Sequence, residues 1–181
     1  MNITYFIIIF AFVFVLALWV AVSFRHLKTS KRTLANKWEF VDEQIRKRHD
    51  LLPLLIETYN RNIESSGELA GHVKELISVR DSARVVYFAG KEKSDREEDL
   101  VAALERFLGY GGKSEELGRD QVYLEIKGEL GELGSDIENR SKEYNEYALK
   151  FNSHMDFVLL KPMASLFRFG KAKVFGEVEV L

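Results

Sequence analysis

Three arginines occupy positions at which a helical bundle normally places leucine. Arg48, Arg80 and Arg140 each fall in a run of apolar residues spaced by threes and fours, which keeps one stripe of a helix facing a partner. A guanidinium on a buried stripe must be paired and hydrogen-bonded, because an unpaired buried charge is costly. The same group also suits a phosphate or carboxylate ligand. The sequence therefore predicts a polar layer that is either structural or ligand-binding.

Two of these arginines are expected at one level of the bundle. Arg48 and Arg80 each lie sixteen residues from Glu64, at the predicted turn between two antiparallel helices. At 1.5 Å per residue, both lie about 24 Å from that turn. Like charges cannot share a buried layer unpaired, so Asp50, Asp81 or an acid from another helix is expected nearby.

The third arginine already has candidate carboxylate partners on its own helix. Asp136 and Glu143 lie four and three residues from Arg140, which favours internal pairing and a structural role for the layer. Tyr144, Asn145 and Asn152 follow on the same helix and would be available to a bound anion in the alternative. The predicted polar layer comprises Arg48, Asp50, Arg80, Asp136, Arg140, Glu143, Tyr144, Asn145 and Asn152.

The residue types that usually carry catalysis or metal binding lack the necessary spacing. The chain has no cysteine, and no two of its four histidines are three or four residues apart. Residues Leu69 and Phe151, three before His72 and His154, exclude the Glu-x-x-His pair of di-iron bundles. We expect no metal, no cofactor and no catalytic site, and therefore a protein that is not an enzyme.

Two further motifs resemble functional sites, but neither is predicted to bind a nucleotide or to act in catalysis. The triplet from Gly112 to Ser114 lacks the first glycine of a P-loop, because position 107 is phenylalanine, and it follows a predicted helix. The acidic pairs Glu97-Glu98 and Glu115-Glu116 are adjacent on helices, so we expect them on solvated faces.

The N-terminal segment is predicted to cross a membrane. Residues 1–24 contain no charged side chain, and at about 1.5 Å per residue they can cross a hydrocarbon core of roughly 30 Å. A cleaved signal peptide is the alternative, with Ala21-Val22-Ser23 as its cleavage site. We favour the transmembrane helix, because the residues before the apolar run carry no positive charge.

A basic segment at residues 25–32 sets the expected orientation. It contains four cations, Arg25, Lys28, Lys31 and Arg32, and none precedes the apolar run. The positive-inside rule then places the N-terminus outside the cell and the rest of the chain in the cytoplasm. We expect the membrane to be the inner, or cell, membrane. These cations are also expected to contact anionic lipid headgroups. The chain after Arg32 has 22 basic and 28 acidic residues, a net charge of −6, which argues against nucleic acid as a partner.

The remaining sequence predicts an all-α fold. We expect an antiparallel bundle of about four helices at residues 33–160, then an irregular C-terminal tail at residues 161–181. The tail could pack on the bundle, lie on the bilayer, or add a strand to a partner. The four helices are predicted at residues 33–62, 67–88, 95–108 and 115–158. The first of them could be continuous with the transmembrane helix.

Particular residues are expected to shape these helices. Pro53 should kink the first helix or restart it. Ser65 with Glu68 resembles a capping box before the second helix, and Ser94 should cap the third after Lys91-Glu92-Lys93 separates the two. Three glycines at 128, 131 and 134 indicate either close approach of a neighbouring helix or local softness in the last one.

Three motifs in order resemble the LemA family. Residues 46–53, Arg-Lys-Arg-His-Asp-Leu-Leu-Pro, are similar to its arginine-rich D-L-I-P segment. The run from Arg140 through Tyr144-Asn145 to Asn152 resembles its R-x-x-Y-N signature, with Phe151 where a second tyrosine is usual. Pro162 followed by Leu166-Phe167-Arg168-Phe169 resembles its P…L-F-G-F segment, with Arg168 in place of glycine. The usual Y-P-x-L segment is missing near residues 117–124.

The resemblance implies a single-pass membrane protein with a cytoplasmic helical bundle and no established catalytic activity. It also implies a role in membrane organisation or envelope quality control. We expect a membrane-anchored scaffold that binds an unidentified protein partner or itself. The alternative is a sensor of an anion or small ligand at the arginine layer.

Overall fold

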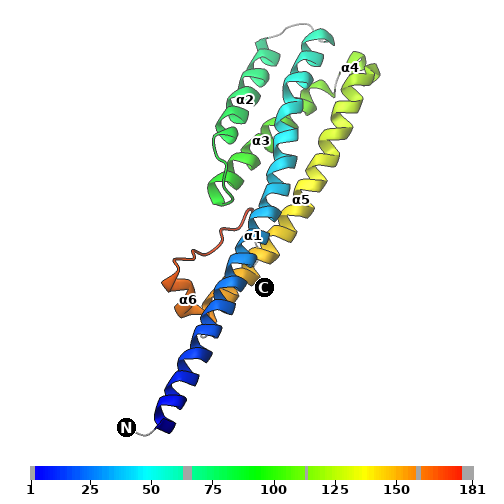
Figure 1. Ribbon diagram of the computed structural model, residues 1–181. Helices are drawn as coiled ribbons and strands as arrows, with labels where there is room; N and C mark the ends of the chain where they lie inside the picture. Colours follow the sequence, from blue (N-terminus) through cyan, green and yellow to red (C-terminus); the bar gives the residue numbers. More distant parts are fainter. Residues whose placement is uncertain (1–2, 63–66, 113, 158–159, 177–181) are drawn as a thin grey trace. The chain divides into compact units, whose positions relative to one another are not determined.

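The computed structural model describes residues 3–62, 67–112, 114–157 and 160–176, and these residues form helices joined by short irregular segments (Figure 1). No strand occurs among them, so the predicted all-α class is confirmed. The helices are α1 (Ile3–Asn62), α2 (Gly67–Arg84), α3 (Lys91–Gly111), α4 (Glu115–Arg119), α5 (Gln121–Asp156) and α6 (Lys161–Leu166).

The first helix is a single element of 60 residues. It continues the apolar N-terminal segment without interruption and passes through Pro53, so the predicted restart at that proline is wrong. The apolar run predicted around Arg48 is confirmed as a buried stripe, because its members Val41, Ile45, Leu52, Leu55 and Tyr59 are all at most 1% exposed.

The boundaries of α2 and α3 differ from the prediction. Helix α2 ends at Arg84, so Tyr87 lies beyond it and is exposed. Helix α3 begins at Lys91, and Ser94 donates its backbone N–H to the Gly90 carbonyl instead of capping the helix. The charged triplet 91–93 was predicted as a separator, but its residues form the first turn of α3. The proposed capping box at Ser65 lies outside the described residues.

The predicted last helix is divided into two. Ser114 caps α4 by accepting from the Leu117 N–H, and α4 ends after one turn. Asp120 then accepts from the Tyr123 N–H through its side chain, at 2.9 Å, and α5 begins. An aspartate that can cap a new helix explains a break that apolar spacing alone did not indicate.

The chain forms two compact units. The larger unit contains the described residues within 37–145 and 173–176, and its core is centred on Leu52, Leu55, Leu76, Leu100 and Phe107. Tyr59 packs on Phe107 with ring centroids 4.1 Å apart and donates to the Phe107 carbonyl. A Cβ at Gly111 would overlap the Tyr59 ring, so glycine is required for this packing.

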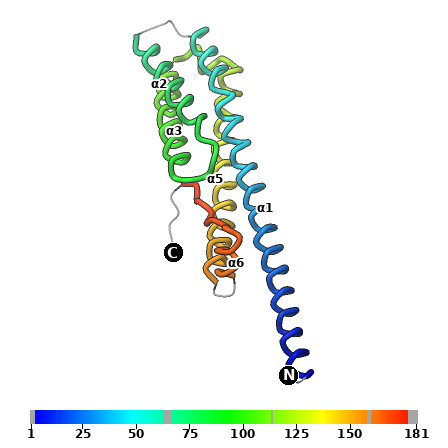
Figure 2. Tube along the Cα trace, turned by 60° about the vertical axis from the view of Figure 1, so that its left-hand side comes forward, coloured from blue at the N-terminus to red at the C-terminus, as the bar shows by residue number. Residues whose placement is uncertain are grey.

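The smaller unit contains residues 3–36, 146–157 and 160–172. Leu27 of α1 packs with Phe151 and Met155 of α5 and with Met163 and Ala164 of α6. Helix α6 turns back beside the C-terminal end of α5 (Figure 2). Of the three alternatives for the tail, packing on the helices is therefore confirmed for residues 163–172, whereas residues 177–181 lie outside the described part of the chain.

The end of α6 has the geometry of a Schellman motif. The Phe169 N–H donates to the Ala164 carbonyl and the Arg168 N–H to the Ser165 carbonyl. This geometry gives Arg168 a φ of 53°, in the left-handed region that favours glycine.

The glycines of α5 do not mark a close contact. A Cβ added at Gly128, Gly131 or Gly134 would meet no atom within 4 Å. The predicted approach of a neighbouring helix is therefore wrong, and local softness of α5 remains as the alternative.

Candidate functional site

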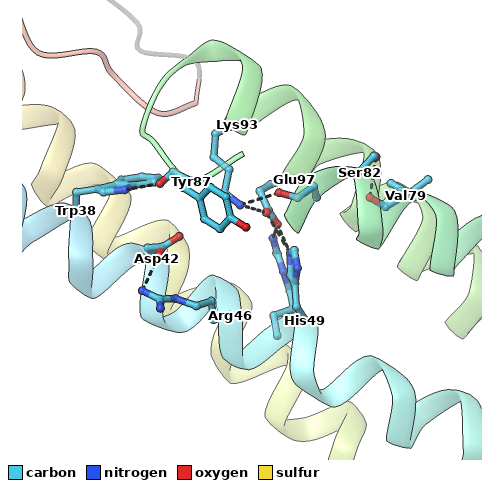
Figure 3. Close-up of polar contacts among 11 residues, drawn as sticks. Trp38, Asp42, Arg46, His49, Val79, Ser82, Tyr87, Lys93 and Glu97 are labelled. Atoms are coloured by element: carbon cyan, nitrogen blue, oxygen red, sulfur yellow. Dashed lines mark hydrogen bonds and ion pairs between the residues drawn. The ribbon is translucent and has the colours of Figure 1, made fainter. Parts of the chain in front are cut away.

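A buried ionic cluster in the larger unit contains one of the predicted arginines. The Glu97 carboxylate on α3 accepts from Arg48 Nη2 on α1 at 2.7 Å. Lys93 Nζ lies 2.7 Å from its other oxygen, and His49 Nε2 lies 3.0 and 3.1 Å from the two oxygens (Figure 3). In these four residues, the Glu97 cluster, the cations of Arg48 and Lys93 and the imidazole of His49 contact a single carboxylate.

Burial makes these contacts strong and their loss costly. Arg48, His49, Lys93 and Glu97 are each 5% exposed or less. Burial by itself raises the pKa of Glu97, but the hydrogen bond and charge of His49, the charge of Arg48 and the hydrogen bond from Lys93 outweigh it and lower the pKa to about 2. Glu97 is therefore a carboxylate at all ordinary pH values.

Backbone carbonyls extend the Glu97 cluster to α2. Lys93 Nζ also donates to the Ala83 carbonyl at 3.0 Å. Arg80 Nε donates to the His49 carbonyl at 2.9 Å, while Arg80 Nη1 lies 3.7 Å from Asp81. Arg80 of α2 thus reaches α1 at His49, the residue after Arg48, so the two arginines lie at one level, as their distance from the turn predicted. The contacts of the Glu97 cluster join α1, α2 and α3.

Several predicted members of the polar layer lie elsewhere. Asp50 and Asp136 are exposed, and Glu143 forms a 3.4 Å ion pair with Lys37. Arg140 is half-buried, with its guanidinium 5.7 Å from the centre of the Phe40 ring. Asp50, Asp136 and Glu143 therefore do not pair with the arginines, whereas Asp81 and an acid from another helix, Glu97, do. Arg140 is not part of the Glu97 cluster.

The signature residues of α5 bind the backbone of the C-terminal tail. In the larger unit, Asn145 accepts from the Phe175 N–H at 2.9 Å and donates to its carbonyl at 2.6 Å. Tyr144 donates its hydroxyl to the Lys173 carbonyl at 2.7 Å. In the smaller unit, Asn152 makes the same pair of bonds to Ala172, at 2.7 and 3.0 Å. We call these pairs the asparagine contacts.

Sequence reasoning missed His49, Lys93 and Glu97. Glu97 was assigned to a solvated face together with Glu98, yet Glu97 is 3% exposed and only Glu98 is exposed. The signal was present, because Lys93, Glu97, Leu100, Leu104 and Phe107 repeat by fours and threes. The error came from the predicted start of this helix at residue 95, which leaves Lys93 outside the stripe and makes Glu97 its only polar member.

A cavity of about 420 Å³ lies beside the Glu97 cluster, between residues of α1, α3, α5 and the tail. Arg48 and Ser141 are among its lining residues, and each has one fully buried polar atom, Nε and Oγ respectively, without a hydrogen-bond partner among the described residues. In the same residues, no group of three or more His, Cys, Asp or Glu side chains is arranged to hold a metal ion.

Comparison with protein families agrees with the motifs. The LemA family model matches residues 37–179, which is most of the chain. The chain belongs to the LemA family. No curated protein matches it. The family match includes the Glu97 cluster and the tail, so both lie within the LemA part of the chain.

Proposed function

We propose that this LemA-family chain is a non-enzymatic scaffold that is anchored in a membrane and binds a protein partner or a second copy of itself. The observation that carries the proposal is an exposed apolar loop between α2 and α3. Val85, Tyr87 and Phe88 are 69%, 68% and 82% exposed. Apolar side chains gathered on a surface favour contact with another molecule.

The exposed loop is attached to the neighbouring helix. Trp38 Nε1 on α1 donates to the Tyr87 carbonyl at 3.2 Å, as Figure 3 shows. This bond fixes the backbone while the Tyr87 and Phe88 side chains stay exposed. A preorganised loop loses less conformational freedom when a partner binds, which supports a docking role.

The proposed anchor is the N-terminal part of α1. It is one helix, near the N-terminus, long and apolar enough to cross a membrane, and only 6% of its most apolar window is buried within the protein. Arg25, Lys28, Lys31 and Arg32 follow it and are all exposed. We propose that they contact anionic headgroups at the cytoplasmic face of the inner membrane, in a role in membrane organisation or envelope quality control.

Site-specific photocrosslinking in intact membranes tests the interaction. A crosslinking side chain at Phe88 should form a discrete adduct with another protein or with a second copy of the chain. The matched position is Glu92, which is exposed on the neighbouring turn of α3 and should give no such adduct. Equal labelling at both positions, or none at Phe88, would contradict the proposal.

The absence of cysteine makes the topology directly testable. A single cysteine at Thr4 should react with an impermeant maleimide from outside the cell. One at Ser135 should react only after the membrane is permeabilised. Loss of the Thr4 label from the mature protein would indicate a cleaved signal peptide instead of an anchor.

A second candidate function is a sensor of a small ligand, favoured by the cavity beside the Glu97 cluster, which Arg48 and Ser141 line. In the predicted sensor, three arginines bind the ligand, but of these three only Arg48 lines the cavity. A ligand-binding role would therefore depend on Arg48 and Ser141.

A further inference from the structure

Apolar side chains are exposed around the short helix α6 of the smaller unit. Leu166, Phe167 and Phe157 are 67%, 41% and 57% exposed, whereas Met163 and Ala164 of α6 are buried in the core of that unit. The packing of α6 on the unit therefore leaves an apolar surface uncovered. Such a surface is unfavourable in water and marks a place where another apolar phase makes contact.

Contacts with α1 give the level of this surface relative to the apolar N-terminal segment. Phe167 lies against Phe24, with ring centroids 4.6 Å apart, and Phe24 is the last residue before the cations begin at Arg25. The Phe169 ring lies 6.1 Å from that of Phe24 and 5.8 Å from Lys31 Nζ. The chain after α6 thus runs from the apolar end of the N-terminal segment into its basic continuation.

A groove beside Phe167 has an entirely apolar lining. Its volume is about 430 Å³, and it is lined by Phe167 and by residues of α1 between Val13 and Phe24. This stretch of α1 belongs to the segment proposed to cross the membrane, so Phe167 extends the apolar surface of the anchor. A lipid acyl chain fits the groove, because the side chains of the lining offer no hydrogen bond to water.

The charge of the smaller unit favours an anionic surface. Its residues include eight basic and two acidic side chains, a net charge of +6, whereas the remaining 18 basic and 26 acidic side chains of the chain give −8. One of the two acids, Asp156, is paired with Lys171 at 2.7 Å. Lys161 begins α6, Arg168 follows its end, and both are exposed. Basic side chains beside exposed apolar ones are typical of an element that lies in the headgroup region of an anionic bilayer.

We propose that α6 and the described residues around it, 157 and 160–169, form a second membrane contact in the cytoplasmic headgroup region of an anionic bilayer. Leu166 and Phe167 enter the upper part of the acyl region, and Lys161 and Arg168 bind lipid phosphate groups. This contact rests on the anchor of the proposed function. It goes beyond the basic segment at residues 25–32, because it assigns lipid binding to the C-terminal part of the chain.

The absence of cysteine allows the depth of a single position to be measured. The full-length chain, with one cysteine at Leu166 that carries the fluorophore NBD, is reconstituted in bilayers of equal parts phosphatidylcholine and phosphatidylglycerol. Lipids with a nitroxide near the top of the acyl chain quench a fluorophore inside the bilayer, whereas iodide quenches one in water. We expect the lipid nitroxide to quench the Leu166 label at least about threefold more than a label at Glu146, because an interfacial helix buries its apolar face.

Glu146 is the matched position outside the bilayer. It is exposed on α5, at the boundary with the larger unit and ten residues before the helix ends at Asp156. The end of α5 is the part near the anchor, because the His154 ring lies 5.9 Å from that of His26 on α1. Ten residues of helix extend about 15 Å, so iodide should quench the Glu146 label and the lipid nitroxide should not.

Lipid composition and one substitution test the two parts of the contact. In phosphatidylcholine alone, lipid quenching of the Leu166 label should fall at least about twofold, because the cations lose their anionic partners. Phe167→Asp should reduce it to about the level at Glu146, because a carboxylate is excluded from the acyl region and repelled by anionic headgroups. Leu149→Asp is the matched control, since Leu149 is also 41% exposed but lies on α5, and it should leave the quenching unchanged. Circular dichroism verifies that both variants keep their helices.

Three results would overturn the proposal. They are quenching of the Leu166 label by iodide and not by the lipid nitroxide, equal lipid quenching with and without phosphatidylglycerol, and lipid quenching that Phe167→Asp leaves unchanged. A label at Leu16, which is exposed in the apolar segment of α1, reports on the anchor. If the lipid nitroxide quenches the Leu16 label but not the Leu166 label, the anchor stands and only the contact at α6 fails. If it quenches neither label, both fail.

Discussion

The Glu97 cluster and the asparagine contacts join distant segments of the chain by opposite kinds of chemistry. In the cluster, a buried carboxylate neutralises cations from α1 and α3. In the asparagine contacts, one neutral amide both donates to and accepts from a single tail residue. The amide pair satisfies the groups it uses, whereas the cluster is balanced only while the carboxylate is present.

This difference predicts where a substitution lowers the stability of the whole fold and where its effect stays local. Removal of one member of a buried ion cluster leaves the other charges desolvated, which destabilises every helix that supplies them. Removal of a neutral amide leaves one backbone N–H and one carbonyl beside solvent, which can replace the bonds. We therefore expect global effects from the cluster and local effects from the asparagines.

The largest effect is expected from Glu97→Gln. The substitution keeps the shape of the side chain but leaves Arg48 and Lys93 without a counter-charge, at a cost of about 3–5 kcal/mol. Urea unfolding of the full-length protein in detergent, followed by circular dichroism, measures it. Glu92→Gln removes the same charge from an exposed position of α3 and should behave as the wild type. Equal stability of the two variants would show that the cluster contributes nothing.

The charge of Glu97 should also appear in the pH dependence. Because folding lowers its pKa from about 4.5 to about 2, its stabilisation is complete above pH 4.5 and is lost as the pH falls toward 2. The difference in free energy of unfolding between wild type and Glu97→Gln should shrink by about 3 kcal/mol across that window. Urea titrations at intervals from pH 6 to pH 2 measure this difference. A constant difference would mean that the loss in the variant is due to packing.

The two asparagines should show smaller and separate effects. Asn145→Ala and Asn152→Ala each remove a pair of bonds to the tail, worth about 1–3 kcal/mol locally. Hydrogen exchange should accelerate at the Phe175 amide in the first variant and at the Ala172 amide in the second, with α1 to α3 unchanged. Asn139→Ala is the matched control, since Asn139 is exposed on the same helix. Faster exchange throughout α1 to α3 would remove the distinction from the Glu97 cluster.

The apolar spacing predicted most of the fold. It identified α1, the buried stripe from Val41 to Tyr59, and the common level of Arg48 and Arg80. These features depend on local periodicity, which one sequence contains. The ends of α2 and α3 and the break at Asp120 depend on caps and on tertiary contacts, so spacing alone misplaced them.

The site was less predictable than the fold. Arginine on a stripe indicated that a carboxylate was needed, but several acids were available and the nearest in sequence was not the partner. Glu97 lies 49 residues from Arg48, and only the packing of α3 brings the two together. Asn145 and Asn152 were identified as important polar residues, but their partners are backbone groups of the tail, which side-chain patterns do not reveal.

The smallest effect is expected at Arg168, where the sequence departs from the glycine usual in the family pattern. Its φ of 53° is unfavourable for a residue with a Cβ, and the greater freedom of glycine in the unfolded chain offsets part of the gain. Arg168→Gly should therefore stabilise the turn after α6 by about 0.5–1 kcal/mol. Hydrogen exchange at the Phe169 amide, which donates to Ala164, measures it.

Arg168→Ala separates the backbone effect from loss of the side chain, because alanine keeps the Cβ and should give no gain. Slower exchange at Phe169 and Ala172 in the glycine variant, with α1 to α3 unaffected, would show that the tail is adjusted independently of the Glu97 cluster. If alanine and glycine stabilise equally, the arginine side chain and not the backbone is the source of the strain. If glycine also slows exchange throughout α1 to α3, the tail and the ion cluster are coupled, and the division into a local and a global kind of polar contact fails.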